Sequence, residues 1–166
     1  MHILIFLLFL NLNFSIEKDS KYIEFNIDCY SFCTIPVSFG SNNDNFTLQL
    51  DTTTSYIWIS STDFDLDVPK YNISNSKKGK KTNKTIEIED EEGIIYGKLS
   101  YDSIKLESIY FNNYSFVLAN YHDKRFKDYP REKLGLGYDT DDKDNFQFIK
   151  RLKEKNLINK ELFVID

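Results

Sequence analysis

Hydrophobic and polar positions alternate along much of the chain, which predicts a protein built mainly of β-strands. The clearest alternation is FTLQL at residues 46–50, where every second residue is apolar. Successive side chains of a strand point to opposite faces, so this segment is expected to be a half-buried strand. Asp51 follows it directly and therefore stands at a strand end, before a second apolar run at residues 56–59.

Other segments carry similar patterns with turns between them. Residues 21–39 and 104–120 contain alternating and apolar runs that we expect to be strands, and GSNNDN at 40–45 is a cluster of turn-forming residues. Residues 60–84 have weak periodicity, a proline and a basic block, which favours a surface loop. ELFVID at 161–166 is a strand-like run.

One helix is predicted towards the end of the sequence. In NFQFIKRLKEKNLI, residues 145–158, apolar side chains three to four positions apart gather near one helical face, with Lys, Arg and Glu elsewhere. This spacing predicts a short amphipathic helix. Its apolar face is expected to consist of Phe148, Ile149, Leu152 and either Leu157 or Ile158.

Length and charge limit the classes of protein that fit. A chain of 166 residues is one ordinary domain, long enough to bury a core. The formal net charge of −5 argues against a nucleic-acid partner, and no basic amphipathic helix suggests a membrane surface. Beyond residue 15, no apolar stretch approaches the roughly 18 residues that a span needs, so no stable membrane span is expected.

The first 15 residues are expected to be a signal peptide. An apolar run from Ile3 to Leu10 is followed by small or polar residues up to Ser15, while a buried N-terminal strand is the alternative. A cleaved leader would leave a domain at residues 16–166 and place the protein in a secreted, extracellular or lysosome-like setting. Four Asn-x-Ser/Thr glycosylation acceptors agree with export, although such motifs also arise by chance: Asn45, Asn72, Asn83 and Asn113.

The two cysteines, Cys29 and Cys33, leave several states open. Four residues of regular strand span roughly 13 Å, which exceeds the reach of a disulfide, so a direct bridge needs a tight bend. Free buried thiols, such a bend, or a partner elsewhere all fit. With no histidine nearby and no nucleotide-binding glycine motif, neither a metal site nor a cofactor is expected.

Asp51 is the candidate functional residue. Thr52, Thr53, Thr54 and Ser55 follow it, and short hydroxyl side chains can hydrogen-bond to nearby backbone or to a carboxylate. The simpler interpretation is a strand-end aspartate in an Asx turn. The functional interpretation is a carboxylate whose pKa is raised by burial and lowered by the donors around it.

The order of residues around Asp51 favours the functional interpretation. LDTTTSYIWI at residues 50–59 resembles the first active-site segment of the pepsin-like aspartic proteases, whose usual form is Asp-Thr-Gly-Ser-Ser-x-Leu-Trp-Val. Thr53 takes the place of the glycine, and Trp58 matches the tryptophan. In that family a tyrosine of the flap bonds this tryptophan and closes over the substrate.

Two further segments extend the resemblance to residues 22–166. LGLGY at 134–138 resembles the segment that passes under the active-site loop, where glycine permits close backbone approach. IEIEDEEGIIYGKLSYDSIKL at 86–106 is similar to the flap hairpin, with Asp90 at the tyrosine position. An acidic flap would attract basic peptides. The flap residues expected at the substrate cleft are Asp90, Glu91, Glu92 and Gly93.

The resemblance implies a mainly β fold, namely a single amino-terminal lobe of a pepsin-like aspartic protease with a flap hairpin and one short amphipathic helix. It implies an aspartic-type endopeptidase in which Asp51 is catalytic and an extended polypeptide is the substrate. Peptide hydrolysis by that route needs two carboxylates that share a proton. No second Asp-Thr/Ser-Gly motif occurs, since Asp102 belongs to the flap strand and Asp139 to an acidic run. Alone, Asp51 is expected to titrate near about 4, and this chain alone to be inactive.

Three functional hypotheses follow, in order of preference. The first is an aspartic endopeptidase whose second lobe is missing from this sequence through truncation. The second is a non-catalytic, secreted peptide- or protein-binding relative, supported by Thr53 and Asp90. The third is a homodimer in which two copies of Asp51 form the pair. His122, the only histidine beyond the leader, is interpreted as a loop residue rather than as a catalytic base.

Overall fold

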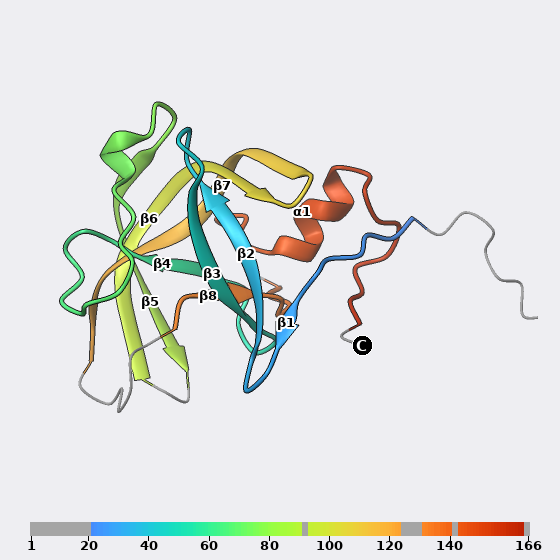
Figure 1. Cartoon of the computed structure of the whole chain (residues 1–166), viewed down its shortest axis with the longest axis horizontal. Helices are drawn as coiled ribbons and strands as arrows, with labels where there is room; N and C mark the ends of the chain where they lie inside the picture. The colour runs from blue at the N-terminus through green and yellow to red at the C-terminus, as the bar shows by residue number, and fades with distance from the viewer. Residues whose placement is uncertain (1–20, 91–92, 124–130, 141–142, 165–166) are drawn as a thin grey trace, which may run out of the picture.

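The alternating segments form strands, and the mainly β prediction is confirmed. The computed structural model describes residues 21–90, 93–123, 131–140 and 143–164, so the expected signal peptide lies outside the described residues (Figure 1). Strands in this part of the chain are β1 (Asp28–Cys29), β2 (Cys33–Phe39), β3 (Asp44–Asp51), β4 (Ile57–Ser60), β5 (Lys80–Asp90), β6 (Gly93–Leu106), β7 (Ile109–His122) and β8 (Lys133–Gly135). A 3₁₀ turn, η1 (Ile73–Asn75), and a helix, α1 (Phe148–Glu154), complete the described elements.

The strands follow the order β1-β2-β3-β8-β4-β7-β6-β5 in one sheet. An additional antiparallel pairing of β2 with β6, at Phe39 and Ile104, joins the two sides of this sheet. The pairing closes β2, β3, β8, β4, β7 and β6 into a barrel, which removes their exposed edges. The long β5–β6 hairpin extends away from the barrel, with its tip towards the lower left in Figure 1.

Two hydrophobic clusters lie on opposite sides of β4. Ile57 and Ile59 belong to a cluster that draws buried side chains from all the barrel strands, together with Phe148 and Leu152 of α1. Trp58, whose side chain points to the other face, belongs to a second cluster that includes apolar residues of β5, β6 and β7. Because alternate residues of β4 enter different clusters, this short strand connects the barrel core to the base of the hairpin.

The predicted helix forms, but over fewer residues than the pattern suggested. It spans Phe148–Glu154 and buries Phe148 and Leu152. The Phe148 ring lies near Phe25 and Phe111, with centroid separations of 6.0 and 6.1 Å. Leu157 and Ile158 are only partly buried and lie beyond the helix, where the Asn156 backbone has a φ of 56°.

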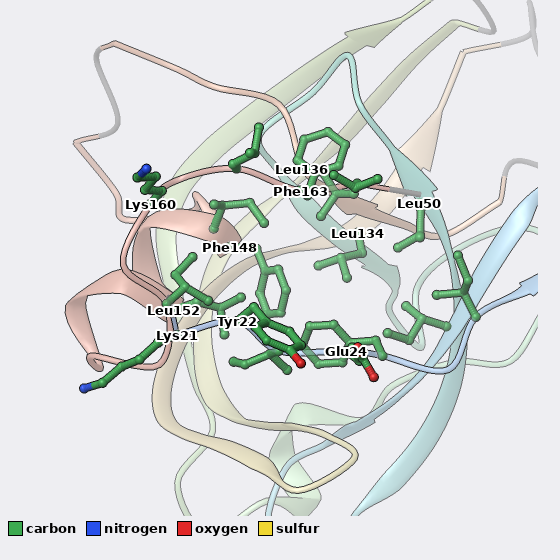
Figure 2. Close-up of a pocket in the computed structure, with 18 of the residues that line it drawn as sticks. Lys21, Tyr22, Glu24, Leu50, Leu134, Leu136, Phe148, Leu152, Lys160 and Phe163 are labelled. Carbon is green, nitrogen blue, oxygen red and sulfur yellow. The ribbon is translucent and has the colours of Figure 1, made fainter. Parts of the chain in front are cut away.

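Both ends of the described chain differ from the prediction of strands. Residues 21–27 and 161–164 are not strands, because they make no ladder with another described strand. They border an apolar pocket of about 900 Å³ beside α1, whose lining includes Tyr22, Leu50, Leu134 and Phe163 (Figure 2). The two ends are adjacent, since the Asn159 backbone N–H donates to the carbonyl oxygen of Lys21 at 3.4 Å.

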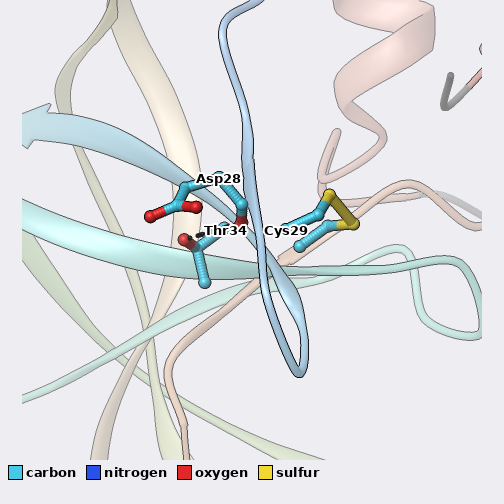
Figure 3. Close-up of a disulfide and its surroundings, with 4 residues drawn as sticks. Asp28, Cys29 and Thr34 are labelled. Atoms are coloured by element: carbon cyan, nitrogen blue, oxygen red, sulfur yellow. Dashed lines mark hydrogen bonds between the residues drawn. A yellow bond between two sulfur atoms is a disulfide. The ribbon is translucent and has the colours of Figure 1, made fainter.

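The two cysteines form a direct disulfide between Cys29 and Cys33 (Figure 3). The bend that such a bridge requires is the β1–β2 hairpin, in which Cys29 pairs with Cys33 and Asp28 pairs with Thr34. The Thr34 hydroxyl also donates to the carbonyl oxygen of Asp28 at 3.3 Å. The sequence left this pairing open because the bend residues, Tyr-Ser-Phe, carry no strong turn signal.

The prediction of a surface loop at residues 60–84 is wrong in part. β5 begins at Lys80, within the basic block, and Phe64, Tyr71 and Ile73 are buried. Their spacing follows neither strand nor helix periodicity, so the pattern did not reveal them. Long-range hydrogen bonds, together with these buried side chains, hold the part of the segment before β5 against the barrel.

Asp102 of β6 is the centre of those hydrogen bonds, and it is fully buried. Its carboxylate accepts the Tyr71 hydroxyl at 2.7 Å, the Ser76 hydroxyl at 2.9 Å and the Ser103 backbone N–H at 2.7 Å. Burial, and then the hydrogen bond to Asp102, raise the pKa of Tyr71 far above its ordinary value. The phenol therefore stays protonated as a donor.

We predict that Asp102→Ala lowers the free energy of unfolding by at least about 1–3 kcal/mol, because it leaves buried donors without an acceptor. Urea denaturation at neutral pH measures the change. The matched control is Asp67→Ala, an exposed aspartate of the same loop region, which should change stability by less than about 0.5 kcal/mol. Equal losses in the two variants would contradict a structural role for the Asp102 network.

Candidate active site

Asp51 ends β3 and begins the loop that leads to β4. Its side chain is buried, and Oδ1 accepts both the Thr53 backbone N–H at 2.7 Å and the Thr53 hydroxyl at 2.6 Å. A carboxylate that accepts a backbone N–H two residues ahead forms an Asx turn. The simpler interpretation of the sequence is therefore correct for the local geometry, and it does not exclude a functional role.

The other carboxylate oxygen contacts a residue that sequence analysis did not identify. Lys133 Nζ lies 3.1 Å from Asp51 Oδ2, and the two side chains are 7% and 8% exposed, so this is a buried ion pair. Lys133 opens β8, where it pairs with Gln49 of β3 and Trp58 of β4. Paired residues of neighbouring strands share a face, and Gln49 and Asp51 share one by alternation, so Lys133 is directed towards Asp51.

A sequence signal for this pair existed. The segment Leu134–Tyr138 was expected to lie under the active-site loop, which places the preceding residue, Lys133, close to that loop. Glu132, the neighbour of Lys133, has another partner, since its carboxylate accepts the Ser60 backbone N–H at 3.1 Å. Burial raises the pKa of Glu132 despite that bond. Among the described residues, Asp51 is the carboxylate in contact with the Lys133 ammonium.

The pKa of Asp51 lies below its ordinary value. Burial raises this pKa. The hydrogen bonds from the Thr53 hydroxyl and backbone N–H, and then the contact with the Lys133 ammonium, together lower it by more than burial raises it. The single acid was expected to titrate near its ordinary value. That expectation is wrong, because the Thr53 hydrogen bonds, and then the Lys133 ammonium, favour the ionised form.

Hydrogen bonds between backbones hold the loop onto the segment after β8. The N–H groups of Gly135, Leu136 and Gly137 donate to the carbonyl oxygens of Tyr56, Asp51 and Thr54, at 2.9, 2.7 and 2.7 Å. A β-carbon at Gly135 would approach the Tyr56 carbonyl oxygen to 2.5 Å, and one at Gly137 would approach that of Thr54 to 2.7 Å. The expectation that these glycines permit close backbone approach is confirmed.

Thr53 fits the loop despite the β-carbon that the glycine of the pepsin-like motif lacks. Its backbone is not among the positive-φ positions of the described residues, and its side chain is exposed. Thr52 is also exposed, whereas Ser55 is buried. Thr54 Oγ1 is buried with no hydrogen-bond partner among the described residues.

The flap hairpin, defined here as β5 and β6, lies beside this loop. Glu87, Ile88 and Glu89 of β5 line a groove of about 240 Å³ together with residues 53–56 and the segment after β8. Asp90 pairs with Gly93 at the hairpin tip. The Asp90 side chain, Glu91 and Glu92 lie outside the described residues.

Trp58 packs under the flap hairpin in the second hydrophobic cluster. Its side chain is 1% exposed, and its ring centroid lies 6.4 Å from that of Phe64. Trp58 Nε1 is buried and has no acceptor among the described residues.

The remaining candidates fall outside this groove. His122 ends β7, with Nε2 3.4 Å from Asp65 Oδ1 and Nδ1 2.8 Å from the carbonyl oxygen of Asp123. The four asparagines of the glycosylation motifs are exposed. Within the described ranges, no group of three or more His, Cys, Asp or Glu side chains could hold a metal ion. The described helices include none with the length and apolarity to cross a membrane.

Comparison with known families agrees with these features. A family model described as eukaryotic aspartyl protease matches residues 32–166. The matched region takes in the loop after Asp51, the flap hairpin and β8. No curated protein matches the chain.

We predict that Asp51→Asn and Lys133→Met each lower the free energy of unfolding by about 3–5 kcal/mol, because each breaks the buried ion pair between these two side chains. The double variant should lose far less than the sum of the two losses, because it removes both charges. Urea denaturation of the four proteins at pH 7 measures this coupling. Additive losses would show that the two side chains do not interact in solution.

Proposed function

The chain belongs to the eukaryotic aspartyl protease family, and from that premise we propose that it forms one lobe of an aspartic endopeptidase. The observation that carries the proposal is the buried carboxylate of Asp51, at the end of β3 in a loop that borders the flap groove. An extended polypeptide lying in that groove would pass between the flap hairpin and residues 53–56 of the loop that follows Asp51.

Hydrolysis of a peptide bond on this lobe requires a second carboxylate, from a companion lobe or from a second copy of the chain. One carboxylate takes a proton from water while the water oxygen bonds to the carbonyl carbon, and the other donates its proton to the carbonyl oxygen. The tetrahedral intermediate then breaks its C–N bond as the leaving nitrogen gains a proton. In this scheme Asp51 is one member of the pair.

The same proposal covers the setting in which the enzyme acts and the charge of the peptides that it prefers. The apolar run at residues 3–10, which we interpret as part of a signal peptide, and the exposed acceptors Asn45, Asn72, Asn83 and Asn113 support a secreted or lysosome-like glycoprotein. The carboxylates of Glu87, Glu89 and Asp139 on the groove lining favour basic peptides over acidic ones.

A second function, peptide binding without hydrolysis, is favoured by one specific observation. Lys133 Nζ lies 3.1 Å from Asp51 Oδ2. An ammonium in contact with a carboxylate favours its ionised form, so Asp51 is less able to share a proton with a second acid. Thr53 at the glycine position points in the same direction. In this case the groove would hold a polypeptide and leave it intact.

Cleavage of a denatured protein at acidic pH separates the two functions. If the chain is a protease lobe, the product of the full-length transcript cleaves the substrate, a transition-state-mimicking peptide blocks cleavage, and Asp51→Asn reduces the rate at least about a thousandfold. Sedimentation of the 166-residue chain tests whether a second copy supplies the other acid. Peptide binding that persists in Asp51→Asn, with no cleavage by either protein, would favour the binding function.

A further inference from the structure

Both oxygens of the Asp51 carboxylate are occupied by donors from the lobe itself. Oδ1 accepts the Thr53 backbone N–H and hydroxyl, and Oδ2 lies 3.1 Å from Lys133 Nζ. A free carboxylate in a shared-proton pair must turn an oxygen towards its partner acid and accept or release a proton there. In this lobe, Asp51 Oδ2 contacts the Lys133 ammonium instead of a second acid.

We propose that Lys133 is an internal counter-ion that keeps Asp51 ionised, so that Asp51 can share a proton with a second carboxylate only after the Lys133 side chain moves away. The consequence for catalysis rests on the proposed function. The ion pair itself does not, because it is formed within this lobe.

The backbone of Lys133 has little freedom to leave the site. It is paired with Gln49 on one side and with Trp58 on the other, so that β8 is held between two strands. The Gln49 backbone N–H also donates to the carbonyl oxygen of Glu132 at 2.9 Å. Only the side chain of Lys133 can move, and its burial makes any position without a counter-charge costly.

The other charged groups around the loop are acids. Glu87 and Glu89 of β5, and Asp139 after β8, line the groove together with residues 53–56. Glu132 is bonded to Ser60, and residues 52–55 of the loop contain no charged group. Among the described residues, Lys133 is the cation in contact with Asp51.

A second carboxylate placed beside Asp51 would meet this cation as well. Two adjacent carboxylates normally hold one proton between them because both cannot ionise at short range. An ammonium in contact with one of them removes much of that repulsion, so both can remain ionised. Such a pair contains no proton to donate to the carbonyl oxygen of a substrate. The position of the Lys133 side chain would therefore determine whether a bound peptide is hydrolysed or only bound.

The direct test is a titration of the Asp51 carboxyl carbon by NMR in the whole chain. The signal is assigned by its absence in Asp51→Asn. We expect the wild-type pKa to lie below the ordinary value of about 3.9, Lys133→Met to raise the proton affinity of Asp51 at least about tenfold, and Lys133→Arg to leave it low. An unchanged pKa in Lys133→Met would overturn the proposal, since the Thr53 bonds alone would then suffice.

A measurement on the wild-type chain guards against failure of Lys133→Met to fold. The Nζ signal of Lys133 should shift with the same midpoint as the Asp51 carboxyl carbon, because protonation of the acid removes the charge that the ammonium faces. Independent midpoints would refute the pairing. Thr53→Ala serves as a comparison, because it removes one hydrogen bond from Oδ1 and leaves the cation in place.

Activity distinguishes this inference from the proposed function. Suppose that the pKa of Asp51 is higher in Lys133→Met, and that neither this variant nor the wild type cleaves peptides when a second lobe is supplied. The counter-ion role then stands and the endopeptidase proposal fails. If wild type and Lys133→Met cleave at equal rates, the endopeptidase proposal stands and the counter-ion role fails. A rate at least tenfold higher in Lys133→Met would support both.

Discussion

The arrangement of the site depends on the insertion of β8 between β3 and β4. Parallel pairing with β3 aligns Gly135 with Asp51 and Lys133 with Gln49, while antiparallel pairing with β4 continues the barrel. Because side chains alternate, the same register directs Leu50 and Leu134 to the pocket beside α1 and directs Lys133 to the opposite face. A shift of one residue would exchange these faces, so the ion pair and the apolar packing specify each other.

Burial gives the Asp51–Lys133 contact its importance. An exposed pair of this kind contributes little to stability, whereas two buried charges must remain together once they are desolvated. The loop reinforces the constraint, since backbone hydrogen bonds from Gly135, Leu136 and Gly137 fix Asp51 and the loop that follows it. The same contacts that position the carboxylate therefore also limit its ability to change protonation state.

Periodicity predicted β3 and the helix near Phe148, whereas the flap hairpin was identified from its resemblance to the pepsin-like proteases. Periodicity could not predict contacts between distant segments. The burial of Tyr71 depends on Asp102, and the Cys29–Cys33 bridge depends on the bend of a hairpin. Asp51 was found because its neighbours form a recognisable order, whereas Lys133 lies 82 positions away and becomes its neighbour only through the β3–β8 register.

Thr53 and Lys133 show that the fold around Asp51 and the proton chemistry at Asp51 can change independently. Thr53 replaces the glycine of the pepsin-like motif, yet it keeps an ordinary backbone conformation and adds a hydroxyl that bonds Asp51. Lys133 leaves the β8 pairing intact and alters the charge that Asp51 experiences. Both residues stabilise the ionised carboxylate, so their effects on its pKa have the same sign. A lobe can therefore retain the fold and the position of its acid while the proton chemistry at that acid changes.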